Sequence, residues 1–296
     1  MATGTGRPDG GQHIGRHDRP EIGRDPIEHG RIGHERIGPA PFIAVDHAGT
    51  GDLVLFMHGI GGNRTNWAAQ LPVFARRYHA VAWDARGYGA SDDYDGQLAF
   101  GDFGDDVLRV LDHFGAARAH LIGLSMGGRI AMDLAGRHPA RVRSLILVDT
   151  HMGFGDFSEA DQQAFLDLRR KPLLAGAEPR DIAGPVARSL LGPKASEAHF
   201  RQLHDSLAAL HKESYIKSIE ATVLQDRFDH LEGIAAPTLV LAGADDRLTP
   251  PDMARRIAAR IPGAECAIIP DAGHLSNIEQ PAIFDRLCLD FLARQS

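Results

Sequence analysis

The stretch Gly123-Leu124-Ser125-Met126-Gly127-Gly128 constrains the fold of this chain more than any other part of the sequence. The mainly apolar run at 120–122 before it is typical of a buried strand, and the segment at 129–137 after it has the period of a helix. Glycines two positions before and after Ser125 leave room for a tight turn between these two elements. We therefore predict a strand, a sharp turn with Ser125 at its apex, and a helix.

The same turn suits a serine that acts as a nucleophile, because a strained turn of this kind holds the hydroxyl of Ser125 clear of the sheet. The N–H of Met126, at the start of the helix, would point toward an oxygen on which negative charge develops. A glycine-rich turn with an incidental serine also arises by chance. The catalytic interpretation therefore depends on the rest of the chain.

Short apolar runs alternate with helical segments along most of the sequence. Apolar runs that are typical of strands occur at 53–57, 79–83, 144–148, 238–242 and 266–269. The run at 53–57 is fully apolar, which suits the interior of a sheet that is covered on both faces. Strands that alternate with helices form a mainly parallel sheet with right-handed crossovers. We predict an α/β fold with a mostly parallel central sheet flanked by helices.

The strand pattern is interrupted once, which divides the expected core into residues 36–150 and 233–296. Residues 151–232 show helical periodicity only, clearest at Phe200, Leu203, Leu207 and Leu210 and continuing toward Val223. About eighty residues are too many for a plain loop, so we expect a helical cap over the active edge of the sheet. Its basic run, 169–171, is predicted to be a solvated helix face.

Residues 1–35 are polar and rich in Gly, Arg, Asp and His. We expect a flexible leader without chemistry of its own, because its four histidines (His13, His17, His29 and His34) share no helical or hairpin spacing that would bind a metal.

Composition argues against several classes of function. The 296 residues are 43% hydrophobic and 24% charged, which is ordinary for a globular protein, and a net charge of −7 argues against nucleic acid or an anionic membrane as partner. Cys266 and Cys288 form no disulfide framework and match no metal-binding spacing. No apolar segment approaches the roughly 20 residues that cross a bilayer, and the N-terminus lacks the apolar core of a secretory signal, so we expect a cytoplasmic location.

Two loops after predicted strands contain further candidate residues. In the glycine-rich loop that follows 53–57, the N–H of Ile60 is the candidate second oxyanion donor, and His58 is expected to brace the loop by hydrogen bonding. In the loop that follows 79–83, Asp84 and Arg86 are interpreted as a structural ion pair.

Ser125, Asp246 and His274 each follow a predicted strand, in an order that suits a catalytic triad on a parallel sheet. A serine hydroxyl is a weak nucleophile until a base takes its proton, and neutral His274 can do so near pH 7. Asp246 would hold the imidazole in the right tautomer and stabilise its charged form. Asp245 and Asp149 remain alternatives for the acid, and Asp246 is favoured. This chemistry needs no metal or organic cofactor.

Five motifs together resemble the bacterial α/β-hydrolase superfamily, over about residues 37–294. They are His58-Gly59-Ile60-Gly61-Gly62, Asp84-x-Arg86-Gly87-x-Gly89-x-Ser91, the elbow at 123–128, Gly243-x-x-Asp246 and Gly273-His274. The resemblance implies the α/β-hydrolase fold with a helical cap, serine hydrolysis and a small-molecule substrate. Nothing in the sequence indicates the oligomeric state or a protein partner.

Within the superfamily, the run at 274–281 and the elbow are similar to 3-oxoadipate enol-lactonases and neighbouring carboxylesterases, although the Arg-Trp-Phe run of those lactonases is absent from the cap. The resemblance implies cleavage of an ester or a lactone through an acyl-enzyme. Carbon–carbon hydrolases of aromatic meta-cleavage products are one alternative, but they usually have Gly-Pro-Gly in the oxyanion loop and an aromatic residue where this chain has Leu275. A non-catalytic receptor with the hydrolase fold is the other alternative.

Overall fold

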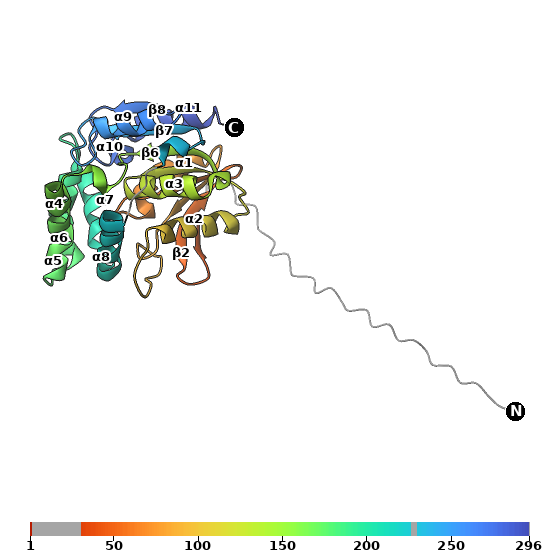
Figure 1. Cartoon of the computed structure of the whole chain (residues 1–296), viewed down its shortest axis with the longest axis horizontal. Coiled ribbons are helices and arrows are strands. Elements are labelled where there is room, and N and C mark those ends of the chain that lie inside the picture. Colours follow the sequence, from red (N-terminus) through yellow and green to blue (C-terminus); the bar gives the residue numbers. More distant parts are fainter. Residues whose placement is uncertain (2–30, 226–229, 296) are drawn as a thin grey trace.

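The computed structural model describes Met1, residues 31–225 and residues 230–295 (Figure 1). Its centre is one sheet of eight strands in the order β1-β2-β4-β3-β5-β6-β7-β8. The strands, in chain order, are β1 Gly33–Ile37, β2 Ile43–Ala48, β3 Leu53–Met57, β4 His79–Trp83, β5 Ala119–Leu124, β6 Val142–Val148, β7 Thr238–Gly243 and β8 Glu265–Ile269.

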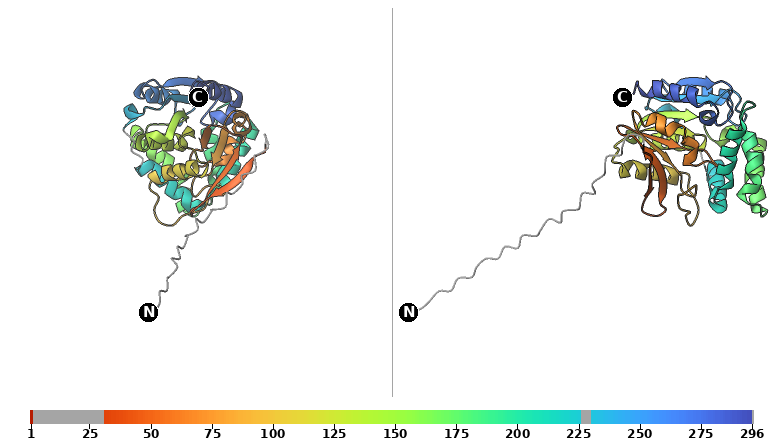
Figure 2. Two further views of the ribbon diagram at one scale, coloured as in Figure 1. Left: turned by 90° about the vertical axis from the view of Figure 1, so that its right-hand side faces the viewer. Right: turned by 180° about the vertical axis from the view of Figure 1, so that it is seen from behind.

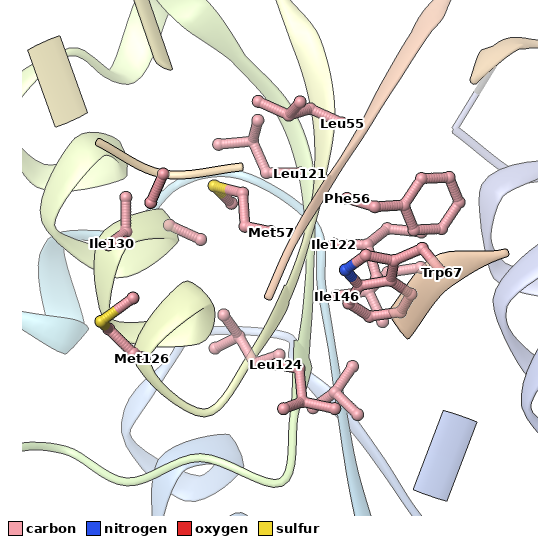
Figure 3. Packing of buried hydrophobic residues seen from close by; sticks show 14 of the residues in the cluster. Leu55, Phe56, Met57, Trp67, Leu121, Ile122, Leu124, Met126, Ile130 and Ile146 are labelled. Carbon is pink, nitrogen blue, oxygen red and sulfur yellow. The ribbon is translucent and has the colours of Figure 1, made fainter. Parts of the chain in front are cut away.

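The sheet is parallel from β4 to β8, and at one edge the pairs β1–β2 and β2–β4 are antiparallel because β2 runs in the opposite direction. Every residue of β3, β5 and β7 is buried, as expected for apolar runs without alternation. Figure 3 shows why: Met57 packs with Ile130 on one side of the strands, whereas Phe56 packs with Trp67 on the other. The predicted α/β fold with a mostly parallel sheet is confirmed.

Helices cover the sheet on both sides of this core. They are α1 Gln70–Phe74, α2 Gly101–His113, α3 Met126–Arg137, α9 Pro251–Arg260, α10 Ser276–Glu279 and α11 Pro281–Leu292. The sequence pattern by itself predicts one helix from Trp67 to about Arg76, but a 3-10 helix at Arg64–Trp67 and the short α1 take its place. Pro72 explains the break, because it has no N–H and is tolerated only in the first turn of a helix.

Between β6 and β7, the described residues form helices and no strand. These are a 3-10 helix at Phe154–Asp156, α4 Glu159–Arg169, α5 Lys171–Leu174, α6 Pro179–Leu190, α7 Glu197–Ala208, α8 Lys212–Glu220, a π-helical turn at Ala221–Gln225 and a 3-10 helix at Leu231–Gly233. Figure 1, and the view from behind in Figure 2, show α4–α8 standing together at one end of the sheet. We call this segment the helical insertion.

The apolar stripe of α7 does not continue as one helix, contrary to the sequence expectation. The helical conformation is interrupted at 209–211, between the end of α7 and the start of α8. The interruption brings Leu207 of α7 and Tyr215 of α8 next to the same residue, Gly61 of the loop after β3. A single straight helix could not bury both side chains there.

The ordered sheet begins at Gly33, slightly before the start near residue 36 expected from the apolar pattern. Polar residues alternate along β1, and ion pairs tie it to the domain: His34 with Asp46 (2.6 Å), and Arg36 with Asp92. Edge strands of this kind have little hydrophobic signal. The other three histidines of the expected leader lie outside the described residues.

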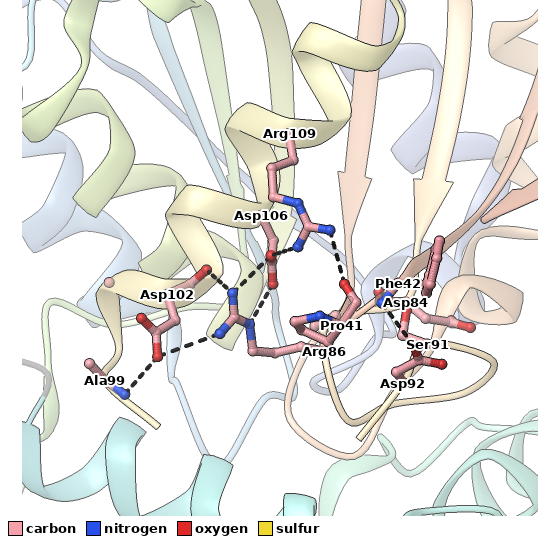
Figure 4. Close-up of polar contacts among 12 residues, drawn as sticks. Pro41, Phe42, Asp84, Arg86, Ser91, Asp92, Ala99, Asp102, Asp106 and Arg109 are labelled. Atoms are coloured by element: carbon pink, nitrogen blue, oxygen red, sulfur yellow. Dashed lines mark hydrogen bonds and ion pairs between the residues drawn. The ribbon is translucent and has the colours of Figure 1, made fainter. Parts of the chain in front are cut away.

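Asp84 and Arg86 do not pair with each other, so the expected loop ion pair is wrong. Arg86 extends to α2, where its Nε donates to Oδ2 of Asp106 (2.6 Å), as Figure 4 shows. Asp84 is fully buried and accepts hydrogen bonds from Arg64 and from the N–H of Ala90 (2.7 Å). The two side chains leave the turn in different directions, and only the packing of the neighbouring elements determines their partners.

Candidate active site

Ser125 lies between the end of β5 and the start of α3 in a strained backbone conformation, with φ 52° and ψ −112°. Its N–H donates to the carbonyl of Val148 on the neighbouring strand (2.9 Å). A Cβ on Gly123 would lie 2.2 Å from the carbonyl oxygen of Gly127, and a Cβ on Gly127 would lie 2.2 Å from that of Met57. Both glycines are therefore required by the close packing of the turn, as predicted.

His274 and Asp246 come together from two different loops. Nδ1 of His274, after β8, lies 2.8 Å from Oδ2 of Asp246, after β7, and both side chains are buried. Asp246 also accepts hydrogen bonds from the N–H groups of Leu248 (2.8 Å) and Thr249 (3.0 Å) and from the hydroxyl of Thr249 (2.6 Å).

The charges of this pair are coupled. Burial by itself raises the pKa of Asp246, but the charge of His274 and these hydrogen bonds outweigh it, so the pKa is lowered. Burial by itself lowers the pKa of His274, but the charge and hydrogen bond of Asp246, and the charge of Asp149, outweigh it, so the pKa is raised. The arrangement stabilises a charged imidazolium next to a carboxylate.

The two alternative acids occupy different places. Asp149 follows β6 with φ 44° and is fully buried. Its Oδ1 accepts from the N–H of Gly243 (2.7 Å), and its Oδ2 accepts from the N–H (3.1 Å) and the hydroxyl (2.6 Å) of Ser276. Burial, together with the charge of Asp246, raises the pKa of Asp149 to about 7. Asp245 is partly exposed, and its N–H donates to the carbonyl of Ala272 (2.8 Å).

Ser125 and His274 line one pocket between the ends of the strands and the helical insertion. Its empty volume is about 430 Å³, and the wall is mainly apolar. The pocket is lined by His58, Gly59, Ile60, Gly62, Asn66 and Trp67 from the segment after β3, by Leu124 at the end of β5, by Arg169, Leu190 and Leu203 from the insertion, and by Leu248 and Leu275 from the loops after β7 and β8.

The predicted oxyanion residues come from two different segments of the chain. Ile60 lines the pocket, and Met126 is the first residue of α3, with its side chain in the hydrophobic core (Figure 3). His58 braces the loop of Ile60, as predicted: its Nδ1 lies 2.8 Å from the carbonyl oxygen of Gly59, and its Nε2 accepts from the N–H of Ala85 (3.0 Å).

Arg169 lines the pocket, so the expectation that it lies on a solvated helix face is wrong. It was expected on a solvated helix face with Arg170 and Lys171, but only 4% of it is exposed. Its guanidinium lies over the ring of Phe165, 4.0 Å from the centroid, and burial lowers its pKa. Phe165 and Arg169 are four residues apart on α4, a spacing that could have placed Arg169 on the apolar face of the helix.

Among residues 31–225 and 230–295, no group of three or more His, Cys, Asp and Glu side chains is arranged to hold a metal ion. Within the same ranges, none of the helices combines the length and apolar character needed to cross a membrane.

Comparison with known proteins places this fold and pocket in a family. The family described as alpha/beta hydrolase fold matches residues 52–281. The chain belongs to this α/β-hydrolase family. The resemblance expected from the five motifs is thus confirmed, and so is the expectation of a hydrolase.

Individual relatives are named for several kinds of hydrolysis. A protein named as a carbamate hydrolase, RutD, from Variovorax paradoxus is 32% identical over 83% of this chain and 93% of its own length. A 3-oxoadipate enol-lactonase from Acinetobacter baylyi is 30% identical, over 82% and 91%. The structure of a thermophilic esterase from Thermogutta terrifontis superposes with a TM-score of 0.78 at 27% identity, over 89% and 99%. Carbamates were not among the substrate classes expected from the sequence.

Proposed function

We propose that this protein is a serine hydrolase that cleaves a carboxylic ester or a lactone through an acyl-enzyme intermediate. The observation that carries the proposal is the 2.8 Å hydrogen bond between His274 and Asp246, on the wall of the pocket that also contains Ser125 at its strained turn. These are the parts that nucleophilic catalysis by a serine requires.

In the first half-reaction, Ser125 attacks the carbonyl carbon and His274 takes the proton of its hydroxyl. The charge that develops on the carbonyl oxygen is stabilised by the N–H groups of Ile60 and Met126. When the intermediate collapses, the bond to the alcohol oxygen breaks and His274 protonates the leaving alcohol. A lactone differs only in that this alcohol stays tethered to the acyl group.

In the second half-reaction, a water molecule gives its proton to His274 and attacks the acyl-enzyme. Collapse returns the proton to Ser125 and releases the carboxylic acid. Asp246 holds the imidazole in place and stabilises its positive charge in both halves. The helical insertion acts as a cap, because α4, α6 and α7 contribute pocket residues opposite Ser125.

The relatives named as carbamate hydrolases support a second candidate, a carbamate substrate cleaved by the same residues. The leaving group would then be an amine, or ammonia, in place of an alcohol. The same residues would act on both classes of substrate, and the assay below distinguishes the two classes.

The test is steady-state hydrolysis of p-nitrophenyl acetate to octanoate, a lactone panel that includes 3-oxoadipate enol-lactone, and a carbamate panel. We expect Ser125→Ala and Asp246→Asn each to lower kcat by about 10⁴-fold or more. Asp245→Asn is the matched control and should stay within about threefold of the wild type.

Turnover of the enol-lactone far above the simple esters would identify a lactonase, and preference for the carbamates would favour the second candidate. Absence of Ser125-dependent turnover in all three panels would refute the proposal. Carbon–carbon hydrolysis and a non-catalytic receptor would then be the remaining explanations.

A further inference from the structure

Arg169, in the last turn of α4, is a buried cation without an anionic partner among the described residues. It is 4% exposed, and within residues 31–225 and 230–295 its guanidinium forms no ion pair and no hydrogen bond. Its neighbours differ: Arg170 pairs with Glu220 (2.7 Å), and Lys171 is exposed. Arg169 is therefore the one residue of the basic run that the fold directs inward.

Arg169 lies where two cavities meet. It lines the pocket of Ser125 and His274, and it also lines an outer groove with an empty volume of about 910 Å³. Leu190 and Leu248 are the other residues shared by the two cavities. A substrate that reaches Ser125 from the groove thus passes the guanidinium.

The outer groove is mainly apolar around this charge. Phe154, Phe157 and Phe165 form its aromatic wall, and Arg247 adds a second, exposed cation. Asp161 also lines the groove, but its carboxylate accepts a hydrogen bond from the hydroxyl of Ser158 at the start of α4 (2.7 Å).

Removing a guanidinium from water is costly unless an opposite charge compensates it. The contact with the ring of Phe165 compensates part of this cost, but it uses only the face of the guanidinium. The N–H donors in its plane are suited to the two oxygens of a carboxylate.

Building on the proposed function, we propose that Arg169 binds a carboxylate carried by the substrate. The substrate is then an anionic ester or lactone: one end presents the carbonyl to Ser125, and the other end pairs with Arg169. The acyl part between them lies against the apolar pocket wall.

The test compares substrates that differ only in this charge. The mono-p-nitrophenyl esters of glutarate, adipate and suberate are each paired with the neutral ester of the same carbon number, namely pentanoate, hexanoate and octanoate. The three lengths cover a range of separations between the reacting carbonyl and the carboxylate.

Arg169→Met keeps the length of the side chain but removes its charge. For the best chain length, we expect the ratio of kcat/KM for anionic over neutral ester to fall about 10- to 100-fold, mainly through KM. Arg169→Lys keeps the charge and should lose less. Arg170→Met is the matched control and should leave the ratio unchanged.

Two further measurements separate binding from folding and from turnover. The thermal midpoint of Arg169→Met should equal or exceed that of the wild type, because a buried unpaired charge has been removed. Glutarate, adipate and suberate are also titrated into the Ser125→Ala variant, with and without Arg169→Met. The best of them should bind at least tenfold more weakly when Arg169 is absent.

If Arg169→Met leaves both the substrate ratio and the dicarboxylate affinities within about threefold at every chain length, the inference is wrong and Arg169 serves packing only. Neutral esters that are still cleaved in a Ser125-dependent way would then leave the proposed function intact. If no ester, lactone or carbamate is cleaved in a Ser125-dependent way but a dicarboxylate binds through Arg169, the proposed function fails and the carboxylate site stands.

Discussion

Asp149 offers a test of how the site is held together, because its carboxylate connects three segments that are distant in sequence. It follows β6, accepts from Gly243 at the end of β7, and accepts twice from Ser276, two residues after His274. The perturbation is Asp149→Ala, which removes the acceptor from two buried N–H groups and one hydroxyl.

The cost follows from these contacts. A buried donor left without a partner costs about 1–3 kcal/mol, and alanine is disfavoured at a φ of 44° by roughly 1 kcal/mol. The three donors and the backbone contribution add up to about 4–10 kcal/mol, so we expect Asp149→Ala to lower the free energy of unfolding by at least about 4 kcal/mol. Asparagine adopts a positive φ more readily than alanine and keeps one acceptor oxygen, so Asp149→Asn should lower the free energy of unfolding by only about 1–2 kcal/mol.

The same residue gives stability a pH dependence with a definite sign. Burial and the charge of Asp246 raise the pKa of Asp149 to about 7 in the folded protein, above its ordinary value of 3.8. The stabilisation that Asp149 gives to the folded protein is thus fully present below about pH 4 and is lost as the pH rises through about 7. Asp149→Asn lacks this titration, so the stability of the wild type relative to this variant should decrease from pH 5 to pH 8.

The assay is urea unfolding at pH 5 and pH 8, followed by the fluorescence of Trp67 and Trp83, which are both buried. Asp245→Ala, at a partly exposed neighbour of Asp246, is the control and should cost less than about 0.5 kcal/mol. The reasoning fails if Asp149→Ala costs under about 1 kcal/mol, or if wild type and Asp149→Asn show the same pH dependence.

Two further predictions concern His274 and the glycines. The raised pKa of His274 places the acid limb of the kcat/KM profile above pH 6.5. Asp246→Asn should move this limb to lower pH, because burial, which lowers the pKa of His274, is then no longer outweighed by the charge of Asp246. A wild-type midpoint below pH 6.5, measured from pH 5 to 9, would contradict this prediction. Gly123→Ala should lower the free energy of unfolding by more than about 3 kcal/mol or abolish turnover, because its Cβ would lie 2.2 Å from a backbone oxygen. Gly184→Ala in α6 is the matched control: its Cβ would meet no described atom within 4 Å, so it should raise the free energy of unfolding by up to about 1 kcal/mol. Equal thermal midpoints for these two glycine variants would refute the steric argument.

Local patterns determined much of this protein by sequence alone. Uninterrupted apolar runs specify strands that are buried on both faces, and the glycines around Ser125 specify a turn that no larger residue fits. The sequence signals for these features are short and local, so the α/β fold, the turn and the bracing role of His58 could be predicted before any coordinates.

Only the tertiary structure decided which side chains meet. Three candidate acids follow strands that end at the same edge of the sheet, namely Asp149, Asp245 and Asp246. Which of them forms the hydrogen bond with His274 depends on small differences in the geometry of the loops. Arg169, Arg170 and Lys171 look alike in sequence, yet the packing of α4 buries the first alone. The burial and the partners of these side chains arise from contacts between segments that are distant in sequence, so a local sequence pattern cannot predict them.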